Sequence, residues 1–145
     1  MSRIAKWVIL ISFIIVIDEC AEASYKRYEF TAKEVYLMAQ AVTGECVIDL
    51  NNIKTEEIYK VLCVIMNRQR HPKFPNTVHG VVMAPGQFHV VPRALKIQPK
   101  WIVLYLVNEW CFAYDRYETK FIQIIPENHL YFGGNGKINR TRARY

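Results

Sequence analysis

The sequence predicts an α+β, mainly helical single domain with a short strand or hairpin near its C-terminus, preceded by an N-terminal signal segment. The chain has 145 residues, 52% of them hydrophobic, which suffices for one modest core. Apolar residues recur at helical spacing through most of the chain. Beyond residue 116 this spacing gives way to alternation followed by turn-forming residues.

The N-terminus has the three-part plan of a secretory signal peptide. Arg3 and Lys6 precede an apolar segment at residues 7–17, and an Ala-Glu-Ala step follows. This segment is shorter than the roughly 20 residues that a membrane span needs. We expect residues 1–23 to be a signal peptide and residues 24–145 to be exported to the periplasm, cell wall or extracellular space. Two alternatives stay open, namely an uncleaved N-terminal anchor and a buried core helix.

The net charge suggests the kinds of binding partner, and the cysteines suggest two possible redox states, but neither identifies the partner. The formal charge of +6 suits nucleic acid, anionic lipid or an acidic cell-wall polymer. The spacing of the cysteines matches no zinc motif. After export, one pair among Cys46, Cys63 and Cys111 could form a disulfide and leave one free thiol. Buried reduced thiols are the alternative, and Cys20 could join only in an anchored protein.

The first helix is predicted at residues 32–43. Thr31 and Glu34 form a capping box, and Gly44 is a natural residue just past a helix C-terminus. One face carries the apolar residues Ala32, Val35, Ala39 and Val42.

A second helix follows the loop at residues 46–54, with Thr55 as its N-cap and Pro72 beyond its end. It has the clearest amphipathic pattern in the chain, at Ile58, Val61, Leu62, Ile65 and Met66.

The remaining elements are a short helix, a long helix and a hairpin region. The short helix is expected near residues 77–82. The long one is expected at residues 100–114, with Pro99 at the N-terminal position that favours proline and with Trp101 and Trp110 in the core. Residues 120–125 alternate like a strand, and the basic tail at residues 137–145 is expected to be frayed.

A dense motif lies between the second helix and the long helix. It comprises Asn67-Arg68, Phe74-Pro75, Thr-Val-His-Gly-Val-Val at residues 77–82 and Pro-Gly-Gln-Phe at residues 85–88. This motif resembles the signature of a cell-wall hydrolase family that includes spore cortex-lytic enzymes and many phage lysins. The resemblance extends over about residues 31–135.

The resemblance implies a lysozyme-like fold that acts on the glycan strand of peptidoglycan. The reaction would be of the glycosidase or lytic transglycosylase kind, between N-acetylmuramic acid and N-acetylglucosamine. It implies peptidoglycan and not nucleic acid as the partner, with membrane contact only through an uncleaved N-terminal segment. It also implies no metal or cofactor, and the oligomeric state stays open. The four histidines show no metal-ligand spacing.

The catalytic acid is where this chain departs from the family. The type motif reads Ala-Glu-Ala-Arg-Gly-Glu, and its first glutamate is the acid. Here Gln40 takes that position, and Glu45 retains the second glutamate after one extra residue. An amide cannot protonate a glycosidic oxygen, so Glu45 is the candidate acid if Gly44 ends the helix and lets it fold back. The alternative is a catalytically weak or inactive peptidoglycan-binding domain.

The resemblance also implies residues that bind the sugar. Gln87 and Phe88 match the cleft-lining pair of the family, and Tyr131 matches a late Tyr-Phe segment. Gln40 is the fourth candidate, because an amide can hydrogen-bond an N-acetyl sugar. An aromatic face beside an amide suits such a ligand. A loop glutamine and a core phenylalanine are the alternative roles for Gln87 and Phe88.

Overall fold

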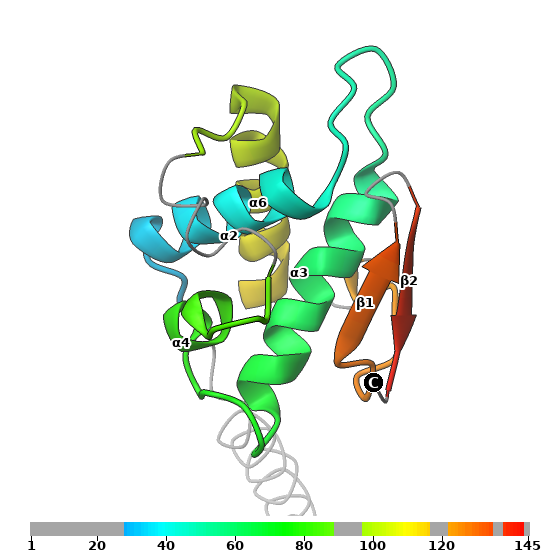
Figure 1. Ribbon diagram of the computed structural model, residues 1–145. Coiled ribbons are helices and arrows are strands. Elements are labelled where there is room, and N and C mark those ends of the chain that lie inside the picture. Colours follow the sequence, from blue (N-terminus) through cyan, green and yellow to red (C-terminus); the bar gives the residue numbers. More distant parts are fainter. Residues whose placement is uncertain (1–27, 89–96, 117–121, 135–137, 144–145) are drawn as a thin grey trace, which may run out of the picture.

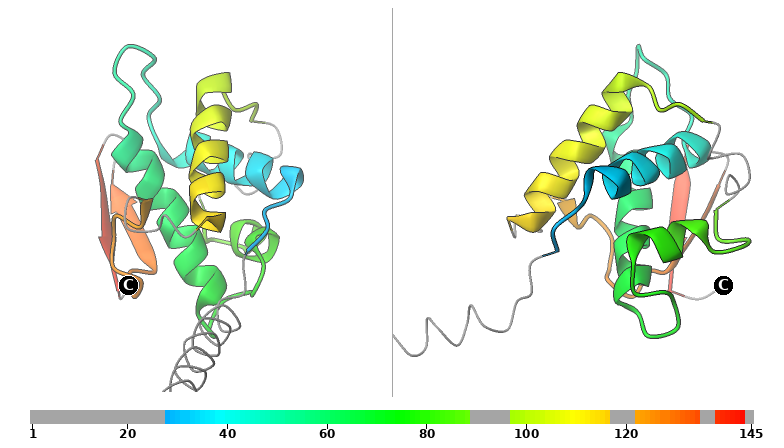
Figure 2. Two further views of the ribbon diagram at one scale, coloured as in Figure 1. Left: turned by 180° about the vertical axis from the view of Figure 1, so that it is seen from behind. Right: turned by 90° about the vertical axis from the view of Figure 1, so that its left-hand side faces the viewer.

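The computed structural model describes residues 28–88, 97–116, 122–134 and 138–143. Helix α3 (Thr55–Arg70) runs through the centre of the molecule (Figure 1). Helices α2 (Ala32–Glu45), α4 (Val78–Met83) and α6 (Trp101–Asp115) pack on one side of it. A hairpin packs on the other side, as Figure 2 also shows. The predicted fold class, mainly helical α+β with a short hairpin, is confirmed.

The hairpin consists of β1 (Tyr131–Gly134) and β2 (Asn139–Arg142), which pair antiparallel. Its position corrects two expectations. The alternating residues 122–125 contribute no strand, and the polar tail that was expected to fray supplies β2 instead. The pairing continues where the backbone N–H of Leu130 donates to the carbonyl of Arg142 at 3.1 Å. The tail is therefore ordered by strand pairing that its own sequence does not reveal.

Helix α3 is buried on two sides, so more of its surface lies in the core than the amphipathic pattern predicts. Every residue from Val61 to Arg68 is buried, because the hairpin covers one side and the other helices cover the opposite side. Its predicted N-cap is wrong by one residue. Lys54 occupies the cap without a side-chain hydrogen bond, and Thr55 is already helical.

Helix α2 begins as predicted and ends later than predicted. The Thr31–Glu34 capping box is present, with the Glu34 backbone N–H donating to the Thr31 hydroxyl at 3.2 Å. The helix then continues through Gly44 to Glu45, and Cys46 caps it. The expectation that Gly44 ends the helix is therefore wrong. The backbone N–H of Cys46 donates to the Val42 carbonyl at 2.9 Å, which closes the last turn.

Two further expectations about α6 and the cysteines need correction. Lys100 is the N-cap of α6, so Pro99 lies outside the helix. Trp110 is fully buried as predicted, but Trp101 is 74% exposed and is not a core residue. Cys46, Cys63 and Cys111 are buried and form no disulfide with one another, so the expected pair among them is wrong and the alternative of buried thiols is supported. The predicted signal segment and Cys20 lie outside the described residues.

Candidate active site

An arginine in the last turn of α3 connects the residues that the motif singles out. Arg68 is only 3% exposed. Its Nε donates to the backbone carbonyl of Leu130 at 2.6 Å, and its Nη1 donates to that of Gln87 at 3.4 Å. A guanidinium can hold two carbonyls at once because its donors are fixed in one plane. Arg68 thereby joins the loop after α4 to the start of the hairpin.

Three aromatic rings surround the same guanidinium. Its central carbon lies 5.4 Å from the ring centroid of Phe74, 5.3 Å from that of Phe88 and 5.6 Å from that of Tyr131. These distances are in the range of cation–π interactions, which gain strength when the cation is desolvated. Phe88, in the loop after α4, and Tyr131, in β1, are both predicted sugar-binding residues, and both lie against the side chain of Arg68.

Burial and nearby charges act on Arg68 in opposite directions. Desolvation lowers the pKa of its guanidinium, whereas the charges of Tyr131 and Glu45 raise that pKa. The carboxylate of Glu45 therefore lies within electrostatic reach of the guanidinium. This places the candidate acid on the same part of the molecule as Gln87, Phe88 and Tyr131.

The neighbouring asparagine orders the segment that leads into β1. The side-chain amide of Asn67 donates to the backbone carbonyls of Pro126 and His129, both at 3.0 Å. Its oxygen accepts a hydrogen bond from Gln123 at 3.3 Å. Asn67 and Arg68 together explain why an Asn-Arg pair ends this helix: both side chains bind backbone carbonyls from distant loops.

The loop that carries Gln87 and Phe88 is shaped by small residues. The Thr77 hydroxyl caps α4 by accepting from the backbone N–H of Gly80 at 3.0 Å. Gly86 has a φ of 71°, a conformation that favours glycine. The turn at Gly86 leads directly to Phe88, which is buried among the core residues, and to Gln87, which is half-buried.

The side chain of Gln40 hydrogen-bonds to a different segment of the chain. It is 6% exposed, and its side-chain nitrogen donates to the backbone carbonyl of Ile97 at 3.1 Å. Because α2 is continuous from Gln40 to Glu45, five residues of helix turn their side chains about 140° apart. Glu45 therefore does not replace Gln40 on the same helix face.

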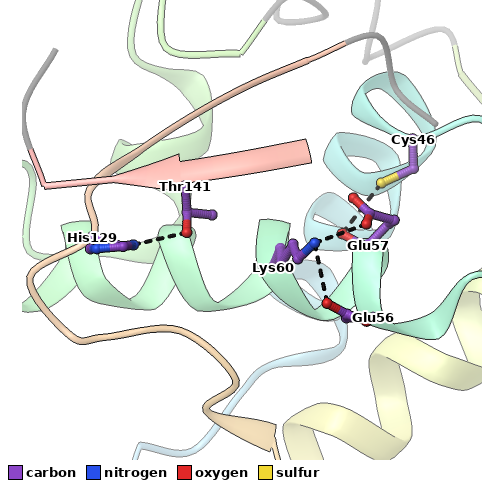
Figure 3. Close-up of polar contacts among 6 residues, drawn as sticks. All are labelled: Cys46, Glu56, Glu57, Lys60, His129 and Thr141. Carbon is purple, nitrogen blue, oxygen red and sulfur yellow. Dashed lines mark hydrogen bonds and ion pairs between the residues drawn. The ribbon is translucent and has the colours of Figure 1, made fainter. Parts of the chain in front are cut away.

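The end of α2 is fastened to the start of α3 (Figure 3). The thiol of Cys46 donates to the backbone carbonyl of Glu57 at 3.6 Å. Lys60 forms ion pairs with Glu57 at 2.9 Å and with Glu56 at 3.2 Å. The thiol bond of Cys46 holds the helix end that carries Glu45, and the two ion pairs brace the first turns of α3 to which it is joined. The same view shows His129 and Thr141 hydrogen-bonded at 2.8 Å, which ties the loop before β1 to β2.

Sequence reasoning found Gln87, Phe88 and Tyr131 but missed the residue that connects them. Arg68 appeared only as part of a motif and as a cation near a helix C-terminus. Phe74 was noted only for the proline after it. A signal was available, because an arginine inside an otherwise apolar helical stretch needs partners when buried. Among the described residues, no group of three His, Cys, Asp or Glu side chains is placed to hold a metal ion.

The fold and this arginine-centred cluster define a mainly helical α+β domain with an aromatic and polar site between helix and hairpin. Residues 54–121 match the family model described as Cell Wall Hydrolase. The chain also resembles the crystal structure of the catalytic domain of the Bacillus cereus SleB protein. That match has 26% sequence identity and a TM-score of 0.53, and it covers 72% of this chain and 73% of that one. No curated protein matches significantly.

These findings confirm the predicted resemblance to the cell-wall hydrolase family and support a peptidoglycan-cleaving function. The family match includes Arg68, Gln87 and Phe88, but it begins after Gln40 and Glu45. The match therefore spans the motif residues and reaches neither position considered for the acid. No helix among the described residues is long and apolar enough to cross a membrane.

Proposed function

We propose that this chain cleaves the glycan strand of peptidoglycan between N-acetylmuramic acid and N-acetylglucosamine, with Glu45 as the proton donor. The observation that carries this proposal is the convergence on Arg68 of Gln87, Phe88 and Tyr131. The charge of Glu45 acts on the same guanidinium. The side-chain amide of Gln87 and the half-buried ring of Tyr131 would hold an N-acetyl sugar there, with buried Phe88 supporting them from the core. The carboxyl group of Glu45 would reach the glycosidic bond from the end of α2.

The chemistry needs one proton to be delivered and later returned. The carboxyl group of Glu45 protonates the glycosidic oxygen, and the bond from that oxygen to the anomeric carbon breaks. The electron-deficient anomeric carbon is then attacked either by water or by the 6-hydroxyl group of the same muramic acid residue. The attacking hydroxyl group gives its proton to the Glu45 carboxylate, which restores the acid.

Between these two outcomes we favour transglycosylation. Hydrolysis with retention or inversion uses a second carboxylate as nucleophile or base. Attack by the sugar's own hydroxyl group needs only one, and Glu45 is the carboxylate whose charge reaches Arg68. Mass spectrometry of soluble fragments from purified cell wall distinguishes them. Transglycosylation leaves 1,6-anhydromuramic acid ends, whereas hydrolysis leaves reducing ends that are heavier by one water.

Glu45→Gln tests the assignment of the acid. Loss of a general acid is expected to slow cleavage by about 10²–10⁴-fold. Asp49→Asn is the matched control, because it makes the same change of charge in the exposed loop four residues later. The oxygen that accepts from the Asn51 backbone N–H at 2.9 Å is kept in that variant. If Glu45→Gln cleaves as fast as the parent, Glu45 is not the acid.

One observation favours a second candidate function, that of a wall-binding domain without cleavage. The residue at the family's acid position, Gln40, is buried and bonded to the Ile97 carbonyl. This candidate predicts that the protein sediments with insoluble peptidoglycan and releases no soluble fragments. A parent protein that cleaves wall excludes it.

Gln40→Glu tests whether a carboxyl group at position 40, where the family motif has its catalytic glutamate, can act as the general acid. The introduced carboxyl group would face the Ile97 carbonyl, which accepts a hydrogen bond only from the protonated form. We therefore expect that carboxyl group to stay protonated near neutral pH, as a general acid must, and cleavage to rise. Gln40→Met is the control, because it removes the same amide donor and adds no acid. Equal activity in the two variants would show that position 40 does not face the scissile bond.

A location at the cell wall follows from the proposed substrate and from the basic charge of the chain. The signal peptide at residues 1–23 stays a prediction. Mass spectrometry of the exported protein would test it, since an intact N-terminus would favour the anchored form with residues 7–17 as a tether.

A further inference from the structure

Helix α6 exposes a row of aromatic side chains on its outer face. Trp101 is 74% exposed, Tyr105 is 55% exposed and Phe112 is 53% exposed. At 100° per residue, the three side chains leave the helix within about 40° of one another. We call these three residues the α6 aromatic face. Large aromatic side chains gathered on one exposed face are uncommon and mark a binding surface more often than chance.

The spacing of the rings suits a polymer of sugars. The helical rise places Trp101 and Tyr105 about 6 Å apart along the axis, and Tyr105 and Phe112 about 10.5 Å apart. These separations are comparable to the advance of one and of two pyranose rings in an extended glycan. Aromatic faces bind the apolar faces of sugar rings and leave the hydroxyl groups in water. Arg116 lies 4.1 Å from the Phe112 ring centroid and adds donors at that end.

A cavity of about 310 Å³ lies at the Phe112 end of the row. Glu29 and Phe30 line it from the segment before α2, and Val35 lines it from α2. From α6 it is lined by Asn108, Cys111, Phe112 and Asp115. Among the described residues, the Oδ1 atom of Asp115 is buried without a hydrogen-bond partner. A buried acceptor without a donor is costly. Asp115 also lines the cavity. A ligand there that brings a donor, such as the N–H of an acetamido group, would supply the missing hydrogen bond.

The other end of the row lies near the loop that follows the proposed acid. The Nζ atom of Lys100, next to Trp101, donates to the backbone carbonyl of Ile48 at 3.3 Å. Ile48 belongs to the loop that leaves α2 three residues after Glu45. Helix α6 packs against α2 (Figure 2). The α6 aromatic face therefore starts near the loop that follows Glu45 and leads along α6 toward the cavity.

We propose that the α6 aromatic face and the cavity at Asp115 form a second carbohydrate-binding surface, which holds an N-acetylated glycan strand beyond the cleavage site. The identity of the glycan rests on the proposed function. Exposed Asn108 and Glu109 lie beside the rings, and a carboxylate there disfavours insertion of this face into a bilayer. The alternation of rings with polar groups suits a strand of sugars.

The double variant Trp101→Ala/Tyr105→Ala tests the aromatic part of the surface. We expect binding to insoluble peptidoglycan and to an N-acetylglucosamine hexamer to weaken about tenfold. Cleavage of short soluble wall fragments should stay unchanged, because neither residue touches the Arg68 cluster. Tyr36→Ala is the matched control, since Tyr36 is exposed on α2 and outside the row. Unchanged binding in the double variant overturns the proposal.

Asp115→Ala tests the cavity with a sugar comparison. The parent is expected to bind the N-acetylglucosamine hexamer more tightly than a glucose hexamer, which lacks the acetamido groups. Asp115→Ala should narrow that preference to what the active site alone confers, and an unchanged preference overturns the role of the cavity. Circular dichroism checks that each variant is folded. Tryptophan fluorescence of the parent, titrated with the hexamer, reports on exposed Trp101 without any substitution, and a flat titration counts against the proposal.

Other occupants of this face give different results. Binding of the parent to anionic lipid vesicles that the double variant loses, with wall binding intact, overturns the proposal in favour of a membrane surface. A parent dimer that the double variant converts to monomer, again with wall binding intact, overturns it in favour of a second copy. If the parent binds wall through α6 but never cleaves it, the proposed function fails and this surface stands.

Discussion

Replacing Arg68 with methionine tests whether this buried cation organises the site. Methionine keeps a flexible apolar stem of similar length but removes the charge and all donors. Two backbone carbonyls, of Leu130 and Gln87, then lose their hydrogen bonds. The three rings around the guanidinium lose a cation.

The size of the effect follows from these contacts. The short bond to the Leu130 carbonyl, made by a charged donor, is worth about 1.5–3 kcal/mol, and the longer one to Gln87 adds less. Loss of the three cation–π contacts adds about 0.5–2 kcal/mol each. Sulfur–aromatic contacts of the new methionine recover about 0.3–1.5 kcal/mol. The folded protein also no longer has the cost of keeping a charged guanidinium out of water, and this gain offsets much of the remaining loss in stability. We expect the free energy of unfolding to fall by about 3 kcal/mol, or the Tm by about 10 °C.

Urea denaturation followed by circular dichroism measures the change, and wall binding and cleavage are measured on the same samples. Arg70→Met is the matched control, because Arg70 lies two residues further along the same helix and its side chain is partly exposed. Its side chain is 42% exposed, pairs with Glu127 at 3.9 Å and lies 5.0 Å from the ring centroid of Tyr114, so its loss should cost about 1 kcal/mol. Below the unfolding temperature, Arg68→Met should also bind wall more weakly, because the loop of Gln87 is no longer held. Equal losses in the two variants would refute the central role of Arg68.

Two further predictions concern the loop and the buried thiols. A methyl group on Gly80 would lie 2.6 Å from the Cβ of Pro75, so Gly80→Ala should cost about 1–3 kcal/mol in urea denaturation. Gly133→Ala, which meets nothing within 4 Å, should cost far less, and a similar cost would contradict this reasoning. Burial raises the pKa of Cys63 to about 11 and that of Cys111 to about 12, from 9.0. Since the unfolded chain releases these protons first, stability should be constant below about pH 9 and fall as the pH rises through 11 and 12. A urea midpoint measured from pH 7 to 11 checks this, and a Cys63→Ala variant with an equally steep decline would contradict it.

The parts of the fold that sequence predicted well are those that local contacts determine. The capping box of Thr31 and Glu34 needs only four consecutive residues, and the structure has it as expected. The apolar spacing of α3 likewise predicted a helix in the right place. Strand β2 could not be predicted in this way. Its residues are polar, and they form a strand because they pair with β1.

The candidate site shows the same division between local and distant contacts. Gln87 and Phe88 could be found because they stand next to each other in a motif. The role of Arg68 depends on Phe74, on the loop at Gln87 and on Leu130, which are far apart in sequence. No spacing rule links them, so only the folded chain shows that they meet.

The end of α2 decides how the missing acid should be understood. Glycine is a poor helix former, by about 1 kcal/mol relative to alanine, which is why Gly44 was expected to stop the helix. The bonds of Cys46 to the Val42 and Glu57 carbonyls hold the next turn in place, and the helix passes through. Glu45 therefore points about 140° away from Gln40 and lies in electrostatic reach of Arg68. A protein that cleaves with Glu45 must then hold the scissile bond nearer Arg68 and Tyr131 than the position of Gln40 would imply. Loss of cleavage in Glu45→Gln, with little change in Gln40→Met, is the pattern that such a shifted cleft requires.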